Sequence, residues 1–426
     1  MATDLQREFM SSRYRIWWIN RFRTRKSSKY LFASVQPTLQ TDCLDIDASF
    51  QLQPTVKITQ MYFRAKTRTV VFNVSCGSHE LVMKILFLQE QSQASNINLP
   101  RIDTQTLSSH DVEVKYLHLF SRLVLNHVTP HFVIPIYRSI TTFEHIKSLL
   151  RTTNSTAKDI QLLSNGEKKN DLYMVFFAEK ANHGTLTAFV RGDLKTMRNL
   201  RLNYVLVAII YQVVYTLACI HIRLPSFKHN DLHTSNILLS RIDTSKIKQA
   251  FPSQQHYVCY VDETGNNAYI DINTCPYRTL LWDFFFSNVS NDDAKRWALG
   301  PMQPGRTTLG GSSAKDARVT PNQYSDLYKM FDTLEFVLRT ADVWNKLEPG
   351  VTQFFDDVVP PAYKCAGLER TDDYRDKLKI HYFHYTTTRD LLSHPVFNIL
   401  RQPIDEVPPI ETYKFNNRLK KHAFPA

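Results

Sequence analysis

The segment HNDLHTSNILLS, residues 229–240, contains the residues of this chain most suited to chemistry. Asp231 and Asn236 lie five positions apart in a polar loop that runs directly into an apolar, strand-like stretch. A carboxylate in such a loop can accept the proton of an attacking hydroxyl, and an amide oxygen five residues later can hold Mg²⁺. The spacing therefore predicts transfer of the terminal phosphate of ATP.

Lys84 is a second candidate, because it lies in the middle of the apolar stretch LVMKIL. A lone charge is costly to bury unless an anionic group faces it. A phosphate and a helix carboxylate would supply that group, and Glu113 lies near the start of the next predicted helix, with Asp111 as a competitor. The alternative is a lysine whose stem packs on apolar residues while its charge reaches water.

Asp283 is a third candidate, since it directly follows the short apolar stretch LLW in LLWDF. A single aspartate after a strand is more often a turn or cap residue. Together with Asn236, however, its position favours ligation of Mg²⁺.

The elements that must position these residues change character along the chain. The first part begins with three strand-like stretches, VKITQMYF, TRTVVFNVS and LVMKILFL. A helix is predicted next from the spacing of Val112, Tyr116 and Leu123, and HVTPHFVIPIY then returns to strand. After residues 178–184 the pattern becomes mainly helical as far as the loop at 229. We therefore predict a hinge near 178–184 with ATP bound in a cleft beneath it.

The stretch Tyr204–Ile220 is almost entirely apolar and approaches the ~20 residues needed to span a bilayer. It falls short of that length and leads within a few residues to a loop whose chemistry needs water-soluble nucleotide. We therefore predict a helix buried in a protein core and no transmembrane segment.

Composition is typical of a globular protein, with 426 residues, 43% hydrophobic and 22% charged. Six cysteines are scattered without a CxxC pair, which argues against a zinc ribbon and a disulfide framework. They indicate reduced thiols in the cytoplasm or nucleus. The N-terminus is too polar for a secretory signal, so export is not expected.

The net charge of +12 is concentrated near the N-terminus, where basic residues alternate with aromatic ones such as Trp17 and Trp18. Such an arm could contact an acidic partner, nucleic acid or an anionic membrane surface. A solvated arm without a partner is at least as consistent with the pattern.

The motifs together resemble the protein kinase superfamily, over roughly residues 55–400. Its strand lysine, helix glutamate, catalytic loop and Asp-Phe-Gly motif correspond to Lys84, Glu113, the loop at 229–236 and Asp283. The form of the catalytic loop is similar to that of divergent serine/threonine kinases encoded by large nucleocytoplasmic DNA viruses. That subgroup implies a viral protein in the host cytoplasm or nucleus, or in the virion.

The resemblance implies an α+β fold with two lobes, a small antiparallel sheet carrying one helix and a larger, mainly helical lobe. The predicted divisions are an N-terminal arm at 1–54, an N-lobe at 55–180, a C-lobe at 181–405 with an insert at 241–278, and a tail at 406–426. Within the insert, the sequence predicts an extra hairpin that turns at Glu263–Asn267.

The resemblance also assigns roles, with ATP and Mg²⁺ as cofactors and proteins as substrates. Asp231, Lys84 and Asn236 are the implied catalytic residues, and Asn236 and Asp283 the metal ligands. The implied nucleotide-binding residues are Lys84, Glu113, Glu179, Ala181 and Leu238, with Ala178 as gatekeeper. Asp326 resembles the buried helix aspartate that supports the catalytic loop, and LLSHPVF resembles the end of the helical lobe.

Four departures from the family pattern stand out. No GxGxxG occurs, and the place where it belongs has no glycine between Phe63 and Cys76, so close approach of bare backbone to phosphate is not available there. Asn230 replaces the usual arginine, so a switch through a phosphorylated loop is not expected. His233 occupies the place where serine/threonine kinases commonly carry a lysine, and Phe285 replaces the motif glycine.

Three hypotheses follow. The first is an active protein kinase that phosphorylates Ser or Thr. The second is a small-molecule kinase of the aminoglycoside or choline type, whose loop also fits His233. The third is a pseudokinase scaffold, suggested by the missing glycine-rich loop. The presence of Lys84, Asp231, Asn236 and Asp283 together favours the first.

Overall fold

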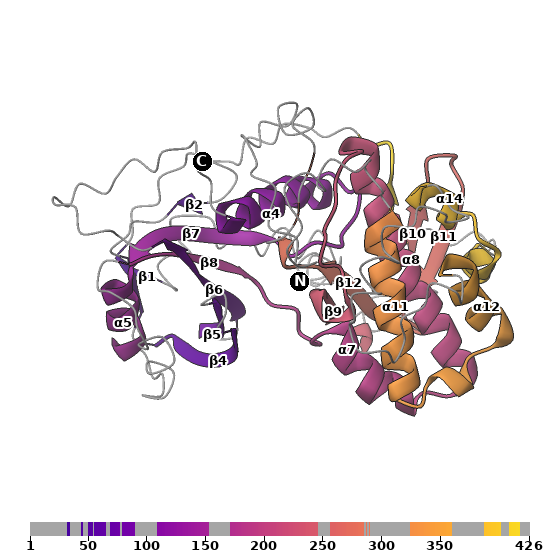
Figure 1. Ribbon diagram of the computed structural model, residues 1–426, viewed down its shortest axis with the longest axis horizontal. Coiled ribbons are helices and arrows are strands. Elements are labelled where there is room, and N and C mark those ends of the chain that lie inside the picture. Colours follow the sequence, from indigo (N-terminus) through magenta and orange to yellow (C-terminus); the bar gives the residue numbers. More distant parts are fainter. Residues whose placement is uncertain are drawn as a thin grey trace, which may run out of the picture. The chain divides into compact units, whose positions relative to one another are not determined.

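The computed structural model describes residues 32–34, 44–45, 50–53, 55–64, 69–76, 79–89, 109–152, 171–245, 256–284, 287, 289, 324–359, 387–401 and 409–417. These residues form two compact units (Figure 1). The sheet unit contains the described residues up to 121 together with 133–180, and the helical unit contains 122–132 and the described residues from 181 onward.

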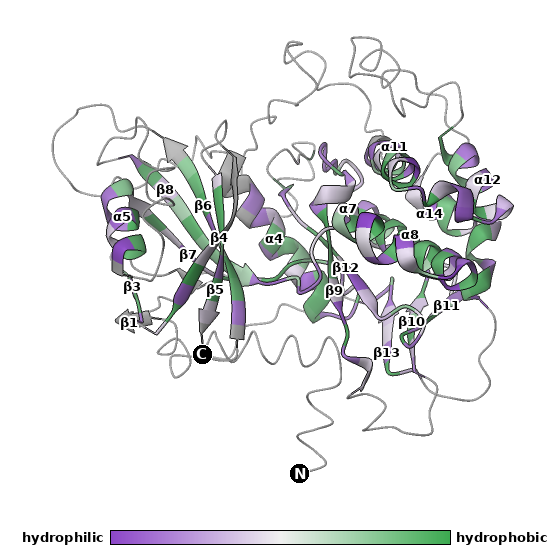
Figure 2. Ribbon diagram, turned by 90° about the horizontal axis from the view of Figure 1, so that it is seen from below, coloured by the Kyte–Doolittle hydropathy of each residue, from purple (hydrophilic) through white to green (hydrophobic). Residues whose placement is uncertain are grey.

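The sheet unit is built on a six-stranded sheet in the order β2-β7-β8-β6-β5-β4. Its strands are β2 (Leu44–Asp45), β4 (Lys57–Arg64), β5 (Thr69–Cys76), β6 (His79–Gln89), β7 (Pro135–Thr142) and β8 (Leu172–Glu179). Hydrophobic residues lie on the central strands β6 and β8 (Figure 2), and all eight residues of β8 are buried. The short β2 pairs with β7 in parallel, and the other neighbours pair antiparallel, in agreement with the predicted α+β class. A separate short pair is formed by β1 (Phe32–Ser34) and β3 (Gln51–Leu52).

Two helices accompany this sheet, whereas the sequence predicted one. The predicted helix is α4 (Ser109–Leu125), and the additional helix is α5 (Phe143–Thr152). Phe143, Ile146 and Leu150 of α5 are buried and recur at helical spacing, so a pattern for it exists in the sequence. The N-terminus of α5 is supported by the Thr142 hydroxyl, which accepts a hydrogen bond from the backbone N–H of His145.

The helical unit contains longer and shorter helices and two small sheets. The α-helices are α7 (Leu186–Phe189), α8 (Asn199–Arg223), α11 (Tyr324–Thr340), α12 (Pro349–Val358) and α14 (Thr388–Leu392). The π-helix η2 (Val190–Leu194) continues α7, and the 3₁₀ helices are η3 (Thr234–Asn236), η6 (Trp344–Lys346) and η8 (Pro395–Leu400). One sheet pairs β9 (Ile237–Arg241) with β12 (Tyr277–Leu281), directly after the predicted catalytic loop.

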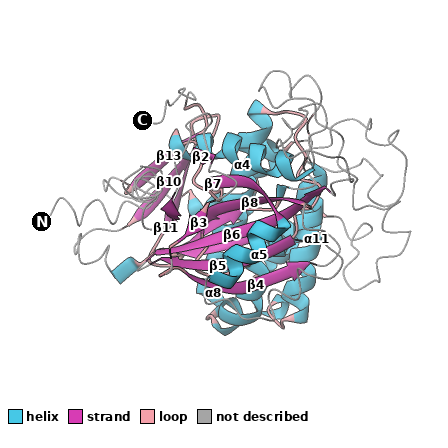
Figure 3. Ribbon diagram, turned by 90° about the vertical axis from the view of Figure 1, so that its left-hand side faces the viewer, coloured by secondary structure: helices cyan, strands magenta, loops and turns pink. Residues whose placement is uncertain are grey.

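The second sheet of this unit lies in the predicted insert and has the order β11-β10-β13 (Figure 3). The predicted hairpin is present as β10 (Tyr257–Val261) and β11 (Asn267–Asp271). In its turn, Gly265 adopts a φ of +88°, which favours glycine, and the Asp262 carboxylate accepts hydrogen bonds from the backbone N–H groups of Thr264 and Asn266. The third strand, β13 (Glu411–Lys414), comes from the predicted tail and pairs in parallel with β10.

Helix α8 contains the apolar stretch that raised the question of a membrane span. Among the described residues it is the one helix long and apolar enough to cross a bilayer, by length and composition alone. Of its apolar window, 94% is buried inside the protein, as expected for a core helix. Cys219 of this helix, Cys259 and Cys275 are buried free thiols.

His221, in the last turn of α8, links this helix to α14. Its Nε2 lies 3.2 Å from the carbonyl oxygen of Phe227, and its Nδ1 lies 3.0 Å from the hydroxyl of Thr388. A neutral ring satisfies both contacts, because Nε2–H donates to the carbonyl and Nδ1 accepts from the hydroxyl. Burial lowers the pKa of His221 to about 4.

The stability of the helical unit is therefore expected to depend on pH through His221. In the unfolded chain the ring takes up a proton near its ordinary pKa of 6.5, whereas in the folded chain it resists protonation until about pH 4. Its contribution is fully present above pH 6.5 and decreases as the pH falls, by about 2 kcal/mol between pH 7.5 and 5.

Urea unfolding at these two pH values, for the wild type and His221→Gln, measures this contribution. Glutamine keeps a donor and an acceptor but does not titrate, so the variant should show a smaller pH-dependent loss of stability. Equal losses in the two proteins would contradict the assignment.

Several predictions fall on residues outside the described ranges. They are the N-terminal arm apart from 32–34, 44–45 and 50–53, the glycine-free turn at 65–68, the replaced motif position Phe285 and most of the tail at 406–426.

Candidate active site

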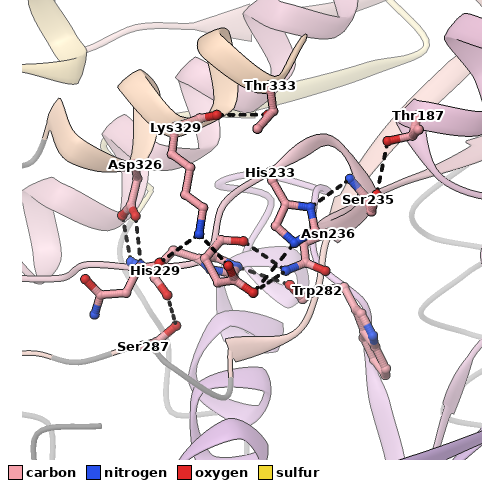
Figure 4. Close-up of polar contacts among 12 residues, drawn as sticks. Thr187, His229, His233, Ser235, Asn236, Trp282, Ser287, Asp326, Lys329 and Thr333 are labelled. Atoms are coloured by element: carbon pink, nitrogen blue, oxygen red, sulfur yellow. Dashed lines mark hydrogen bonds and ion pairs between the residues drawn. The ribbon is translucent and has the colours of Figure 1, made fainter. Parts of the chain in front are cut away.

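The predicted catalytic loop is anchored in the helical unit by the buried Asp326 of α11. Its carboxylate accepts hydrogen bonds from the backbone N–H of His229, at 2.6 Å, and of Asn230, at 2.8 Å (Figure 4). Asn230 has a φ of +61°, a conformation uncommon for a residue with a side chain. The two hydrogen bonds hold this bend, so the supporting interaction predicted for Asp326 is present.

Burial raises the pKa of the Asp326 carboxyl, although the hydrogen bonds from the two backbone N–H groups and the nearby Lys329 ammonium act in the opposite direction. Asp326→Ala would leave two N–H groups, one buried and one half-buried, without this acceptor, at a cost of about 1–3 kcal/mol for a buried one. We expect a loss of stability in that range or above, measured by urea unfolding. Asp326→Asn retains a carbonyl oxygen and should lose less. Equal stability of Asp326→Ala and the wild type would show that the loop does not need this anchor.

His229 connects the loop to the segment after β12. The ring is fully buried, and Nε2 lies 3.1 Å from the carbonyl oxygen of Trp282. It also packs against Phe284, with ring centroids 4.9 Å apart, and the Ser287 hydroxyl donates to the His229 carbonyl oxygen. Burial lowers the pKa of this imidazole despite three nearby carboxylates, which favours a neutral ring with a structural role.

Asp231 is held from both sides of its carboxylate. Nζ of Lys329, from α11, lies 2.5 Å from Oδ1. On the other side, Nδ2 of Asn236 lies 3.3 Å and Nε2 of His233 lies 3.6 Å from Oδ2. Burial alone would raise the pKa of the Asp231 carboxyl, but hydrogen bonding by His233 and the Lys329 ammonium outweigh it and hold the pKa well below its usual range. The carboxylate is therefore ionised at neutral pH.

Asn236 and Asp283 are brought to the same end of the two-stranded ladder of β9 and β12. Ile237 pairs with Leu281, and the backbone N–H of Trp282 donates to the carbonyl oxygen of Asn236 at 3.2 Å. The amide nitrogen of Asn236 donates to Asp231, so the amide oxygen is the atom that can act as a ligand. One amide oxygen and one carboxylate form an oxygen donor set that suits Mg²⁺.

No group of three or more His, Cys, Asp or Glu side chains arranged to hold a metal is found in the described part of the chain. The pair Asn236 and Asp283 nevertheless fits Mg²⁺, because this ion keeps several waters and is commonly bound through one or two carboxylates and substrate phosphates.

Lys84 and Glu113 form the predicted ion pair within the sheet unit. Nζ of Lys84, on β6, lies 2.6 and 2.8 Å from the two carboxylate oxygens of Glu113, on α4. The side chains are 4% and 0% exposed, so the pair is screened from water. The competitor Asp111 has a side chain outside the described set.

The residues predicted to contact adenine lie at the end of β8 and after it. Ala178 is buried in β8, and the Glu179 carboxylate accepts a hydrogen bond from the backbone N–H of Ile134 at 2.7 Å. Ala181 begins the next part of the helical unit, and Leu238 of β9 pairs with Leu280 of β12. The contacts of Glu179 and Leu238 described here stabilise the fold. The nucleotide-binding roles of these residues stay predictions.

The sequence motifs did not mark Lys329 as part of the site. It follows Asp326 by three residues on the same helix, and residues three apart share a helix face. Because Asp326 was expected to face the loop, this spacing could have predicted that Lys329 faces it too. Thr187 was also missed; its hydroxyl lies 2.7 Å from that of Thr234 in the loop.

Two comparisons with known proteins bear on the site. No protein-family model matches the chain. The chain is 27% identical over 239 residues to "Putative serine/threonine-protein kinase R400" of Acanthamoeba polyphaga mimivirus. The match includes 53% of this chain and 45% of that protein, so it spans less than half of the relative's length. The chain is thus similar to a viral protein named as a kinase.

Proposed function

We propose that the protein is an ATP- and Mg²⁺-dependent protein kinase that phosphorylates serine or threonine hydroxyls. The observation that carries the proposal is the arrangement around Asp231. Its carboxylate is ionised, lies on a loop anchored by Asp326, and precedes a ladder that places Asn236 and Asp283 at one end. A similar combination of a hydroxyl-orienting carboxylate and an oxygen pair for metal serves phosphoryl transfer in protein kinases.

In the proposed reaction, the hydroxyl oxygen of the substrate forms a bond to the γ-phosphorus of ATP. The bond from that phosphorus to the β,γ-bridging oxygen breaks, and its electron pair leaves with ADP. Asp231 orients the hydroxyl and accepts its proton. Mg²⁺, held by Asn236 and Asp283, would neutralise charge on the phosphates.

The remaining predicted residues have proposed binding roles. Lys84, oriented by Glu113, would contact the α- and β-phosphates. The backbone around Glu179 and Ala181 would contact adenine, and Leu238 would pack under the base. The lysine–glutamate geometry supports the first assignment, because a preformed ion pair keeps the ammonium in one orientation.

Protein substrates are proposed over small alcohols for two reasons. The relative's name specifies a serine/threonine-protein kinase. The sequence LLSHPVF, which resembles the end of a protein kinase helical lobe, forms α14 and η8 in the same unit as the loop.

The test is a transfer assay with the full chain, γ-labelled ATP, Mg²⁺ and a panel of basic, acidic and neutral protein substrates. Asp231→Asn and Lys84→Met serve as inactive controls. Label on seryl or threonyl residues that disappears in both variants supports the proposal. Label confined to aminoglycosides or choline would assign a small-molecule kinase, and a wild type without turnover would leave a scaffold.

A further inference from the structure

We infer that Lys329 is a catalytic residue of this site, and that its ammonium contacts the phosphoryl group as it moves to the hydroxyl oriented by Asp231. The inference rests on the proposed function. Lys329 belongs to α11 and lies 98 positions after Asp231 in the sequence.

The position of Lys329 is set by its helix. Asp326 and Lys329 are one turn apart on α11, and both side chains point toward the loop (Figure 4). Asp326 holds the loop backbone, whereas Lys329 reaches the reactive carboxylate itself, with Nζ 2.5 Å from Oδ1 of Asp231 and 3.3 Å from the carbonyl oxygen of Asn230. One helix face thus fixes the backbone of the loop and supplies a cation to it.

The ammonium has the capacity for a further contact. It carries three N–H donors, and the two contacts to Asp231 and Asn230 use two of them. The Lys329 side chain is 17% exposed, so it is mostly buried but still open to a bound substrate. A third donor is therefore available for a phosphoryl oxygen.

The distances place such an oxygen within reach. A hydroxyl bound to Asp231 has its oxygen about 2.7 Å from the carboxylate. The phosphorus that it attacks lies about 3–3.5 Å farther on. Because Nζ of Lys329 touches the same carboxylate, a phosphoryl oxygen on the Lys329 side of that hydroxyl would lie within reach of its remaining donor.

His233 does not supply this charge. Its Nδ1 accepts a hydrogen bond from the backbone N–H of Ser235, and its Nε2 faces Oδ2 of Asp231, so the ring is committed to the loop. In the protein kinases that the sequence resembles, this position commonly carries a lysine. In this chain the loop has no lysine at that position, and Lys329 of α11 lies beside the Asp231 carboxylate instead.

The test compares Lys329→Met, Lys329→Arg and a control, Lys346→Met, with the wild type in the transfer assay. Lys346 lies in the same unit and donates to the carbonyl oxygen of Lys195, away from the loop residues. We expect Lys329→Met to lower kcat about 100-fold with KM for ATP changed less than about twofold, because the contact forms during transfer. Lys329→Arg keeps the charge and should recover part of kcat, and Lys346→Met should behave like the wild type.

A contact to the transferred group has a second readout. ATPγS carries sulfur in place of one γ-phosphoryl oxygen, and sulfur is a weaker hydrogen-bond acceptor. The ratio of kcat for ATP to kcat for ATPγS should therefore be smaller in Lys329→Met than in the wild type. A residue that only positions Asp231 would lower both rates and leave the ratio unchanged.

The outcomes separate the two proposals. Turnover by the wild type that Lys329→Met retains would overturn the role of Lys329 alone. Equal loss in Lys329→Met and Lys329→Arg, with a matching loss of folded protein in urea unfolding, would assign a structural role and also overturn it. A wild type without turnover would overturn the proposed function and, with it, this inference.

Discussion

Asp231→Asn is expected to lower kcat for phosphoryl transfer by about 10²–10⁴-fold, the range contributed by a well-placed acid–base group. The amide cannot accept the hydroxyl proton and no longer attracts the ammonium of Lys329, which lies 2.5 Å from Oδ1 in the wild type. The protein should remain folded, because Asp326 holds the loop backbone independently and the partly exposed Lys329 can be hydrated.

Steady-state kinetics and a thermal melt on the same preparations check this expectation. Asp342→Asn is a matched control, since Asp342 lies in the same unit, its side chain is 83% exposed, and its neighbour is Lys195 rather than the loop. If Asp231→Asn kept more than about a tenth of the wild-type kcat, Asp231 would not be the group that takes the proton.

Lys84→Met is expected both to abolish transfer and to destabilise the sheet unit by about 3–5 kcal/mol. The substitution deprives the Glu113 carboxylate of an ammonium that lies 2.6 and 2.8 Å away, in a place where neither side chain has appreciable contact with water. Removing one member of a buried ion pair is costly because the other member remains charged in a poorly solvating environment.

The double variant Lys84→Met with Glu113→Leu separates the two effects. Replacing both charges with apolar groups is often neutral for stability, so the double variant should regain most of the lost stability. It should not regain transfer, because the proposed phosphate contact needs the ammonium. Urea unfolding of the wild type, both single variants and the double variant gives the coupling energy. Recovery of transfer together with stability would show that the pair serves only the fold.

Much of the site could be predicted from local sequence. Asp231 and Asn236 belong to one short loop that leads directly into a strand. Residues five positions apart in such a loop have few possible arrangements, and the two residues are in contact. Glu113 was expected beside Lys84 because a buried ammonium needs an anionic partner, and Asp326 was expected to support the loop because of the resemblance to protein kinases; both interactions are present.

Parts of the fold were predictable for the same reason. The apolar stretch at 204–220 implied a buried helix, and the turn at 263–267 implied the hairpin of β10 and β11. Helix α5 was missed although Thr142 can cap its start and its buried apolar residues recur at helical spacing. The pairing of β13 with β10 was not predictable, because a parallel pairing between strands far apart in the sequence has no local signature.

By itself, the sequence determined which residue types are available for phosphoryl transfer and which of them share a loop, a strand or a helix turn, because these relations depend on spacing along the chain. Only the tertiary structure decided that Lys329 meets Asp231, that β13 pairs with β10, and that the expected pair of Lys84 and Glu113 is almost completely shielded from water. Such contacts depend on how separate elements pack, and a charge buried between two of them takes its partner from whichever side chain the packing brings near.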